Sequence, residues 1–288
     1  MKKLLSLGLI AVLAVVVLAG CGGAERLPAE NGNGETDTMR GLINVVTRED
    51  GSGTRTAFID MLGIEDIWDE ANVQNGTSAV INTVAGSNIS IGYSSLGSIE
   101  GNNTVRAITI DGVAPTAANI RSGAYPISRN FSIVTTTELS DAARDFIDFI
   151  FSIDGTAIVD NSYIAAVPAG TDFEVGNVSG TIVVGGSTSV APLVTELARA
   201  YMELNGDVRI EVQPLGSSAG INGAIEGTFD IGLTSRPMTA AELADASETV
   251  IAVDGIAVIV PASNPLVGLT VEQVANIFTG AVERWEEL

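Results

Sequence analysis

Apolar residues along the chain alternate between short strand-like runs and longer runs with helical spacing. Residues 43–47, Ile-Asn-Val-Val-Thr, predict a strand, and a helix with Phe58, Met61 and Leu62 on one face is expected after it. The alternation continues to the last residues of the sequence. Further strands are expected at 105–110, 131–134, 181–184, 208–212 and 251–260, and further helices at 142–151 and 271–278. This order predicts an α/β fold with parallel or mixed sheets.

Three turns rich in glycine and serine each follow an expected strand and open an expected helix. Glycine lets the backbone approach a ligand closely, and a helix start offers unpaired N–H groups and partial positive charge. Each turn alone is also compatible with an ordinary connection capped by Ser or Thr. Because all three lie beyond the carboxyl ends of strands, together they predict an anion-binding site. The turns are 51–53, 185–189 and 216–220.

The composition narrows the range of partners. The chain has 288 residues, enough for one or two domains, and a formal net charge of −21. Lys2 and Lys3 are the only lysines, so the mature chain is more acidic still, which argues against nucleic acid as a partner. There is no histidine and a single cysteine, Cys21, which removes the commonest metal ligands. We expect no metal and no cofactor.

One turn suggests an enzyme, but the rest of the chain argues against it. Residues 216–220 match the Gly-x-Ser-x-Gly pattern of an esterase nucleophile, with Ser218 at its centre. Such a serine needs a base, and neither histidine nor a lysine of the mature chain is available. A nucleotide P-loop is excluded by the same lack of lysine. We therefore expect binding without catalysis.

The N-terminus has the layout of a secretory signal. A basic start, an apolar run from Leu4 to Leu18 and small residues precede Cys21. This boundary resembles the bacterial lipoprotein signal, which implies cleavage before Cys21 and lipid attachment to its sulfur. Residues 1–20 are then the signal peptide, and residues 21–40, polar and rich in Gly, Asn and Glu, form a flexible tether.

Several motifs together resemble the phosphate-binding protein family of high-affinity phosphate ABC importers. They are residues 48–55 (Arg-Glu-Asp-Gly-Ser-Gly-Thr-Arg), 91–97, 186–192, 216–220, 230–236 and 277–280 with Trp285. The resemblance implies a two-lobed fold of the periplasmic-binding-protein type (type II-like), closing on one phosphate. It implies these phosphate-binding residues: Arg48, Ser52, Gly53 and Thr54 from one lobe, and Thr188, Ser189, Ser217 and Ser235 from the other. Asp50, Arg55 and Arg236 are expected in supporting roles.

The order of these motifs departs from the family. The segment 48–55 comes first here, although in the family it follows the Gly-Ser-Thr-Ser loop. A circular permutation explains this order, with residues 168–180 as the linker that joins the family's two ends. The alternative is a fragment of two tandem binding proteins. The lobes are then expected at residues 41–126 with 264–288, and at 127–263.

The resemblance also implies the partners. We expect inorganic phosphate as ligand, an ABC permease as partner, a monomer, and a lipid anchor on the outer face of the cell membrane. Some family members have an aspartate where Ser235 stands, and it accepts the proton of phosphate. Its absence leaves open another tetrahedral oxyanion, such as sulfate, molybdate or tungstate. A surface lipoprotein that senses phosphate without transporting it is a further alternative.

Overall fold

A computed structural model describes residues 39–288 of the chain. The expected signal peptide, Cys21 and most of the expected tether lie outside the described residues. Among the described residues, no helix combines the length and the apolar composition needed to cross a membrane.

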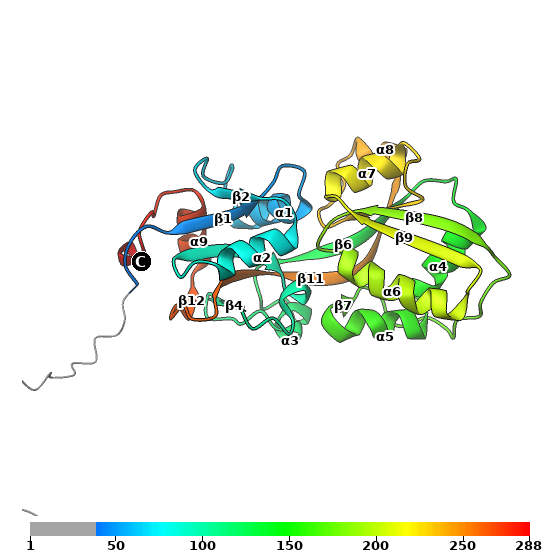
Figure 1. Cartoon of the computed structure of the whole chain (residues 1–288), viewed down its shortest axis with the longest axis horizontal. Coiled ribbons are helices and arrows are strands. Elements are labelled where there is room, and N and C mark those ends of the chain that lie inside the picture. The colour runs from blue at the N-terminus through cyan, green and yellow to red at the C-terminus, as the bar shows by residue number, and fades with distance from the viewer. Residues whose placement is uncertain (1–38) are drawn as a thin grey trace, which may run out of the picture. The chain divides into compact units, whose positions relative to one another are not determined.

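Two groups of elements make up the described part, and Figure 1 shows blue, cyan and red segments in one group and green and yellow segments in the other. The first group has helices α1 (Gly53–Leu62), α2 (Thr77–Ala85), α3 (Ala117–Arg121) and α9 (Val271–Phe278), with the short turns η1 (Gly97–Ile99) and η2 (Trp285–Glu287). Its strands are β1 (Asn44–Arg48), β2 (Asn72–Gln74), β3 (Ser90–Ser95), β4 (Val105–Ala107), β5 (Thr109–Ile110) and β12 (Gly268–Leu269).

The second group has helices α4 (Asp141–Ile150), α5 (Ile153–Ser162), α6 (Ala191–Leu204), α7 (Ser217–Ile225) and α8 (Glu242–Asp245). Its strands are β7 (Ile164–Ala165), β8 (Gly180–Gly186), β9 (Val208–Pro214) and β10 (Ile231–Thr234). Two strands, β6 (Ser128–Thr135) and the 15-residue β11 (Ser247–Pro261), connect the groups.

One mixed sheet runs through both groups in the order β2-β1-β3-β11-β6-β10-β8-β9. β1 pairs parallel with β2 and β3, and β8 pairs parallel with β9 and β10. β11 is antiparallel to β3 and to β6, and β6 is antiparallel to β10. Together, β11 and β6 therefore join two parallel parts that run in opposite directions. The α/β architecture and the mixed sheet confirm the fold class expected from the alternating pattern.

Separate hydrophobic cores define two lobes. Ile127 and Ile256 belong to one core, whereas Phe131 and Ala252 belong to the other. We therefore assign residues 39–127 and 255–288 to the first lobe and residues 128–254 to the second. The return from the second lobe lies near Gly255, inside β11, rather than at residue 263 where the sequence pattern placed it, because a single strand serves both cores.

The element boundaries show where the pattern was informative. The strand expected at 43–47 is β1, the helix expected at 142–151 is α4, and the last expected helix is α9. No helix or strand lies between β7 and β8, over residues 166–179, and residue 180 of the expected linker already belongs to β8. Helix α5 was not expected, because its sequence Ile-Asp-Gly-Thr-Ala-Ile-Val-Asp-Asn-Ser has weak helical periodicity.

The first and last described segments lie side by side. The N–H of Ile43 donates to the carbonyl of Glu283 at 2.8 Å, and the N–H of Trp285 donates to the carbonyl of Gly41 at 3.0 Å. Leu42 and Arg284 form an isolated antiparallel bridge. Neighbouring ends of this kind are what a circular permutation of a fold requires.

Candidate functional site

Helix starts from both lobes converge between them. α1 and α2 begin at Gly53 and Thr77 in the first lobe, and α7 begins at Ser217 in the second. Residues 187–189, which lead into α6, lie beside them: Thr188 and Ser189 bond to residues of the first lobe. The N–H groups of a first helical turn have no partner within the helix, and the helix dipole adds partial positive charge. An anion placed here meets several such starts at once.

The turn before α1 has a backbone shape that allows another group to come close to it. Gly51 has a φ of 81°, a conformation that glycine adopts without steric cost. Ser52 then caps the helix, because its hydroxyl accepts a hydrogen bond from the N–H of Arg55 at 3.3 Å. The capping interpretation of Ser52 is therefore correct. Its side chain is 1% exposed, and Thr54 next to it is 2% exposed.

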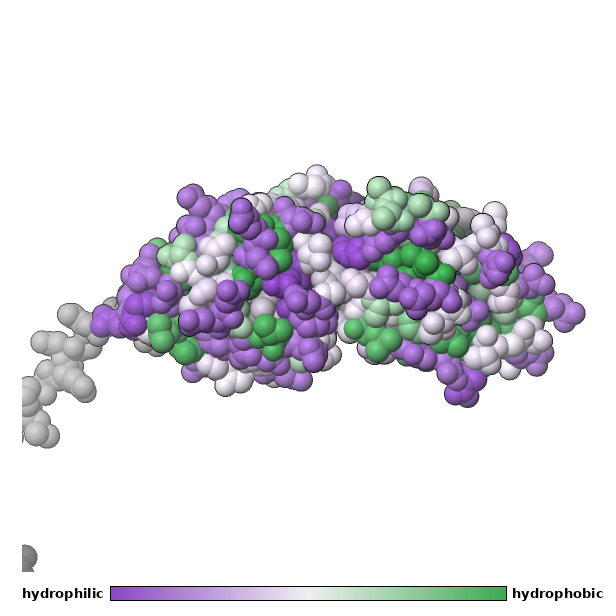
Figure 2. Space-filling view, turned by 90° about the horizontal axis from the view of Figure 1, so that it is seen from above, coloured by the Kyte–Doolittle hydropathy of each residue, from purple (hydrophilic) through white to green (hydrophobic). Residues whose placement is uncertain are grey.

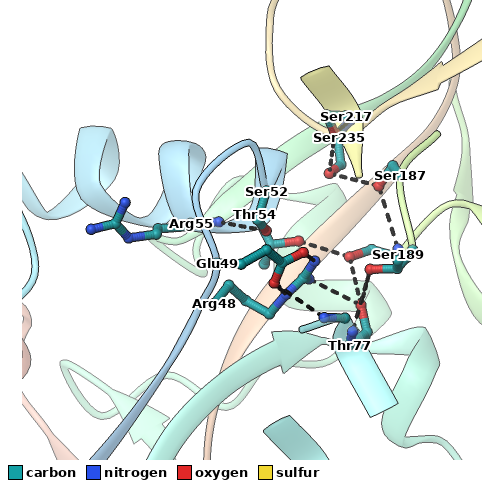
Figure 3. Close-up of polar contacts among 12 residues, drawn as sticks. Arg48, Glu49, Ser52, Thr54, Arg55, Thr77, Ser187, Ser189, Ser217 and Ser235 are labelled. Atoms are coloured by element: carbon teal, nitrogen blue, oxygen red, sulfur yellow. Dashed lines mark hydrogen bonds and ion pairs between the residues drawn. The ribbon is translucent and has the colours of Figure 1, made fainter. Parts of the chain in front are cut away.

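The guanidinium of Arg48 is buried at the end of β1 and has three partners. Its Nε and one terminal nitrogen donate to the two carboxylate oxygens of Glu49 at 2.7 and 2.6 Å. Its other terminal nitrogen donates to the Thr77 hydroxyl at 3.3 Å. The bidentate fork of the Arg48 guanidinium is thus occupied by Glu49. The remaining terminal nitrogen points to the hydroxyl groups of the cleft (Figure 3).

Glu49 also connects β1 to the start of α2. One of its oxygens accepts the N–H of Gly76 at 3.1 Å. Burial raises the pKa of this carboxyl, but the hydrogen bonds and charge of Arg48 and the Gly76 N–H outweigh burial and lower it overall. Glu49 is therefore ionised near neutral pH and holds Arg48 in place. No role for Glu49 was predicted from the sequence.

Hydroxyl groups of the two lobes bond directly to each other. The Thr54 and Ser189 hydroxyls lie 2.7 Å apart. The Thr77 hydroxyl lies 3.0 Å from that of Thr188 and 3.2 Å from that of Ser189. Figure 3 shows Thr54 and Thr77 pointing at Ser189 from the opposite side of the cleft. The lobes therefore meet through groups that can either donate to an anion or bond to one another.

Three serines from three separate turns form the second-lobe wall. Ser187 follows β8, Ser217 opens α7 and Ser235 follows β10. The Ser187 hydroxyl donates to that of Ser235 at 2.9 Å, and the Ser217 hydroxyl lies 3.2 Å from it. The Ser235 N–H donates to the Ser217 hydroxyl at 3.0 Å. The three are at most 2% exposed, so this polar cluster is buried and internally satisfied.

Gly53 marks the closest approach of the lobes. A Cβ at this position would contact the Ser217 hydroxyl and would lie 2.8 Å from both the Ser217 Cβ and the Ser235 hydroxyl. Real Cβ atoms essentially never come this close to such neighbours. In addition, the N–H of Ser218 donates to the carbonyl of Gly51 at 3.1 Å. Only glycine at residue 53 allows the two walls to touch.

The structure brings the eight expected phosphate-binding residues together, and it adds others. We name the eight residues of this set that carry a hydroxyl group the hydroxyl cluster: Ser52, Thr54, Thr77, Ser187, Thr188, Ser189, Ser217 and Ser235. Two of its members, Thr77 and Ser187, were not singled out from the sequence. Asn75-Gly76-Thr77-Ser78 does carry a signal, since a hydroxyl follows a glycine at a helix start, as in the other turns. Arg48 and Gly53 complete the site.

The three expected supporting residues lie around this cluster. Arg55 pairs with Asp50 and, at 2.6 Å, with Asp66, so it fixes the turn rather than facing the hydroxyl cluster. Arg236 pairs with Glu242 at 2.8 Å and donates to the Ser218 hydroxyl at 3.4 Å. The hydrogen bond from Arg236 contributes most to lowering the pKa of Glu242, to about 2. Ser218, the serine of the esterase pattern, thus contacts a cation and no base.

Comparisons with known proteins agree with this arrangement. The model of the PBP superfamily domain matches residues 35–154 and 172–288. The chain is 40% identical to the phosphate-binding protein PstS 2 of Streptococcus agalactiae, over all of this chain and 99% of the relative. It is 37% identical to PstS 2 of Streptococcus pneumoniae, with the same coverage.

A crystal structure titled as a phosphate ABC transporter, phosphate-binding protein, from Streptococcus pneumoniae is also similar. The TM-score is 0.69 at 39% identity, over 86% of this chain and 99% of that chain. The alignments run from end to end, so these relatives have the motifs in the same order as this chain. The chain belongs to the PBP superfamily and, within it, to the family of the phosphate-binding proteins PstS.

Proposed function

We propose that the chain binds one inorganic phosphate ion between its two lobes and delivers it to an ABC permease for import. The observation that carries the proposal is the hydroxyl cluster. It joins buried hydroxyls of both lobes and the buried cation Arg48 at converging helix starts. A dehydrated phosphate needs many donors arranged around a tetrahedron, and this is what hydroxyls, helix N–H groups and one guanidinium supply.

The acidic surface does not conflict with an anionic ligand. On the face shown in Figure 2, residues 39–288 are mostly purple and white, with separate green patches. Long-range repulsion from surface carboxylates is screened within about 10 Å at moderate salt. Inside the cleft, Arg48 supplies a buried positive charge beside the hydroxyl cluster, and its side chain is 2% exposed. Local donors therefore decide binding, and the surface charge slows association at low ionic strength.

The names of the relatives support the transport role. They describe phosphate-binding proteins and a component of a phosphate ABC transporter. Proteins of this kind capture their ligand outside the cytoplasm and bind without transforming it. We infer the same here, with Cys21 as the lipid-bearing residue at the outer face of the membrane. Cys21→Ser should release the protein from the membrane fraction and leave its phosphate affinity unchanged.

Calorimetry tests the central part of the proposal. The mature protein should bind phosphate with a stoichiometry of one, and Ser217→Ala should weaken the binding. Ser122→Ala is a matched control, because Ser122 is exposed at the end of α3 and its hydroxyl donates to the carbonyl of Asn119 in its own turn. Absence of heat with phosphate, or equal affinity in both variants and wild type, would refute the assignment.

A second candidate ligand is a fully deprotonated oxyanion such as sulfate, molybdate or tungstate. The observation in its favour is that Ser235, rather than a carboxylate, lies in the hydroxyl cluster, while the nearby Glu49 is paired with Arg48. A serine hydroxyl can donate or accept, so it discriminates less between protonated phosphate and sulfate. Ser235→Asp should widen the preference for phosphate, because a buried carboxylate facing sulfate has no proton to pair with.

Competition calorimetry of wild type and Ser235→Asp decides between these ligands. If wild type ignores a large excess of sulfate and the aspartate variant gains no selectivity, another group accepts the proton of phosphate. If sulfate or molybdate binds more tightly than phosphate, the second candidate replaces the first. A protein that binds phosphate but supports no uptake with its permease would instead be a sensor.

We further infer that the chain is a circularly permuted monomer of the family. The neighbouring positions of Gly41 and Trp285 support the permutation, and both lobes come from one chain. Light scattering of the mature protein should give a monomer with and without phosphate. A dimer with exchanged lobes would show as a doubled mass, and a stoichiometry near one half would favour a fragment of a tandem protein.

A further inference from the structure

A second buried arginine lies beneath the hydroxyl cluster, at the place where the lobes are joined. Arg129 of β6 stands opposite Asp254 of β11 in the strand register. Ile127 and Ile256 on one side of this pair belong to the first-lobe core, and Phe131 on the other side belongs to the second. The pair therefore lies where β6 and β11, the two strands that connect the lobes (Figure 1), pass from one core to the other.

The guanidinium of Arg129 is buried but incompletely paired. One terminal nitrogen donates to Asp254 at 3.2 Å and the other donates to the backbone carbonyl of Ser235 at 3.4 Å. Its Nε has no partner although it is fully buried. The side chains of Arg129 and Asp254 are 2% and 1% exposed. A fully satisfied ion pair has shorter, bidentate bonds, as Arg48 and Glu49 do.

The two carboxylate oxygens of Asp254 contact different lobes. One oxygen faces Arg129, and the other accepts a hydrogen bond from the Ser95 hydroxyl of the first lobe at 2.9 Å. Burial raises the pKa of Asp254, and the charge of Arg129 opposes that rise. Burial likewise lowers the pKa of Arg129, which Asp254 counteracts, while the positive charge of Arg48 adds to the lowering.

Resting on the proposed anion-binding function, we propose that Arg129 is a second cationic residue of the site. It acts through Ser235 as a positioning residue, and Asp254 sets how much of its charge the anion experiences. The carbonyl that Arg129 binds belongs to the residue whose N–H and hydroxyl bond to Ser217. Arg129 thus orients the second-lobe wall, and its charge attracts the anion from below at low local dielectric.

This role makes opposite predictions for the two members of the pair. Arg129→Gln should weaken phosphate binding about tenfold, because one cation near the anion is lost. Arg129→Lys should retain most of the affinity, because the charge stays. Asp254→Asn should strengthen binding by up to about tenfold, because it removes the charge that offsets Arg129. A purely structural ion pair would give weaker binding in all three variants.

The double variant separates coupling from a direct effect of Asp254. In Arg129→Gln/Asp254→Asn, the strengthening caused by the asparagine should disappear, because it operates through Arg129. If the asparagine strengthens binding equally with and without Arg129, the proposed role of Arg129 is wrong. Unchanged or weaker binding in Asp254→Asn alone also overturns it, and this holds even if Arg129→Gln fails to fold.

Calorimetry with inorganic phosphate on the full mature chain is the experiment, with Arg48→Ala as the reference. If Arg48→Ala loses binding while the pair variants bind as wild type, the inference fails and the proposed function stands. If wild type binds neither phosphate, sulfate nor molybdate, the proposed function fails, and the inference with it. Thermal melting of each variant shows whether a loss of affinity reflects unfolding.

Discussion

The first lobe supplies most of its half of the cleft from one short segment, whereas the second lobe supplies its half from three turns far apart in the sequence. Residues 48–54, with Thr77, provide the cation and the hydroxyls on the first side. On the second side, residues 187–189, Ser217 and Ser235 provide hydroxyls and N–H groups, and the nearest buried cation, Arg129, lies beneath them. One lobe thus contributes direct charge and the other contributes a shaped wall of donors.

This difference implies an unequal division of binding free energy. A hydrogen bond to a charged group contributes about twice as much as one between neutral groups. We therefore expect single substitutions in the first-lobe segment to have the larger effects. The second-lobe wall has overlapping hydroxyls, so loss of one leaves others in reach of the ligand. Single substitutions in the two lobes test this ranking of their contributions to binding.

Arg48→Ala should weaken phosphate binding by about 2–3 kcal/mol, because it removes the cation whose terminal nitrogen bonds to the Thr77 hydroxyl of the cleft. Arg121→Ala is the control, since Arg121 is 59% exposed on α3 and pairs weakly with Asp160. Calorimetry should show the loss in the first variant only. Similar affinities for the two variants would mean that the first lobe does not supply the main charge.

Gly53→Ala tests the contact between the two sides. The added methyl group would press on Ser217 and Ser235, and overpacking of this kind costs about 1–3 kcal/mol. Phosphate binding should weaken by a similar amount, because the methyl group pushes apart the two walls that hold the anion. Gly206→Ala is the control because a Cβ there meets nothing within 4 Å. Unchanged affinity in Gly53→Ala would show that the walls do not need to touch.

Thr77→Val should weaken phosphate binding by about 1 kcal/mol, because the Thr77 hydroxyl bonds to Arg48 and to two hydroxyls of the other lobe. Thr83→Val on the same helix is the matched control, since Thr83 lies away from these contacts. Isothermal titration of both variants measures the difference. A larger loss in the control would assign the effect to α2 stability rather than to the cleft.

The element pattern and the turns were readable from the sequence, but the pairing of charges was not. Ser52, Thr54 and Ser217 lie in short motifs where local rules for helix starts place them, and Ser235 lies in the short motif 230–236 that follows β10. The Arg129–Asp254 pair joins residues 125 positions apart, and no periodicity connects them. Its members meet only because β6 and β11 pair antiparallel where these two strands pass from one lobe to the other. Tertiary pairing of this kind leaves no local signal.

Arg48 shows the same limit at short range. The structure places this arginine beside Thr77 of the hydroxyl cluster, and the adjacent Glu49 occupies its fork, which the motif did not show. In the same way, Asp50 was expected only in a supporting role, and the structure pairs it with Arg55. Side-chain pairing among neighbouring charges depends on backbone turns that composition does not specify.

Glu242→Gln should give the smallest effect and should act on stability rather than on binding. Arg236 holds the pKa of Glu242 at about 2, below its ordinary value of 4.5. A carboxyl with a lowered pKa stabilises the fold above its ordinary pKa, and this contribution is lost as the pH falls through about 2. At neutral pH the variant should lose about 1 kcal/mol in urea unfolding, as expected for a pair near the surface.

The difference between the Glu242 variant and wild type should therefore shrink as the pH is lowered from about 5 towards about 2. Phosphate affinity at neutral pH should stay the same, because Arg236 bonds only to groups of the second lobe, Ser218 and Glu242 among them, and is expected only in a supporting role. Weaker phosphate binding in this variant would give Arg236 a direct role and would remove the contrast with Arg48.

Hydrogen exchange in the presence and absence of phosphate tests most directly whether both lobes hold one anion. The account predicts that residues 51–55 in the first lobe and 216–219 in the second become protected together, at the same phosphate concentration. The control is the linker, residues 168–179, where exchange should not change. Protection confined to one lobe, or binding heat without protection in either segment, would contradict the account.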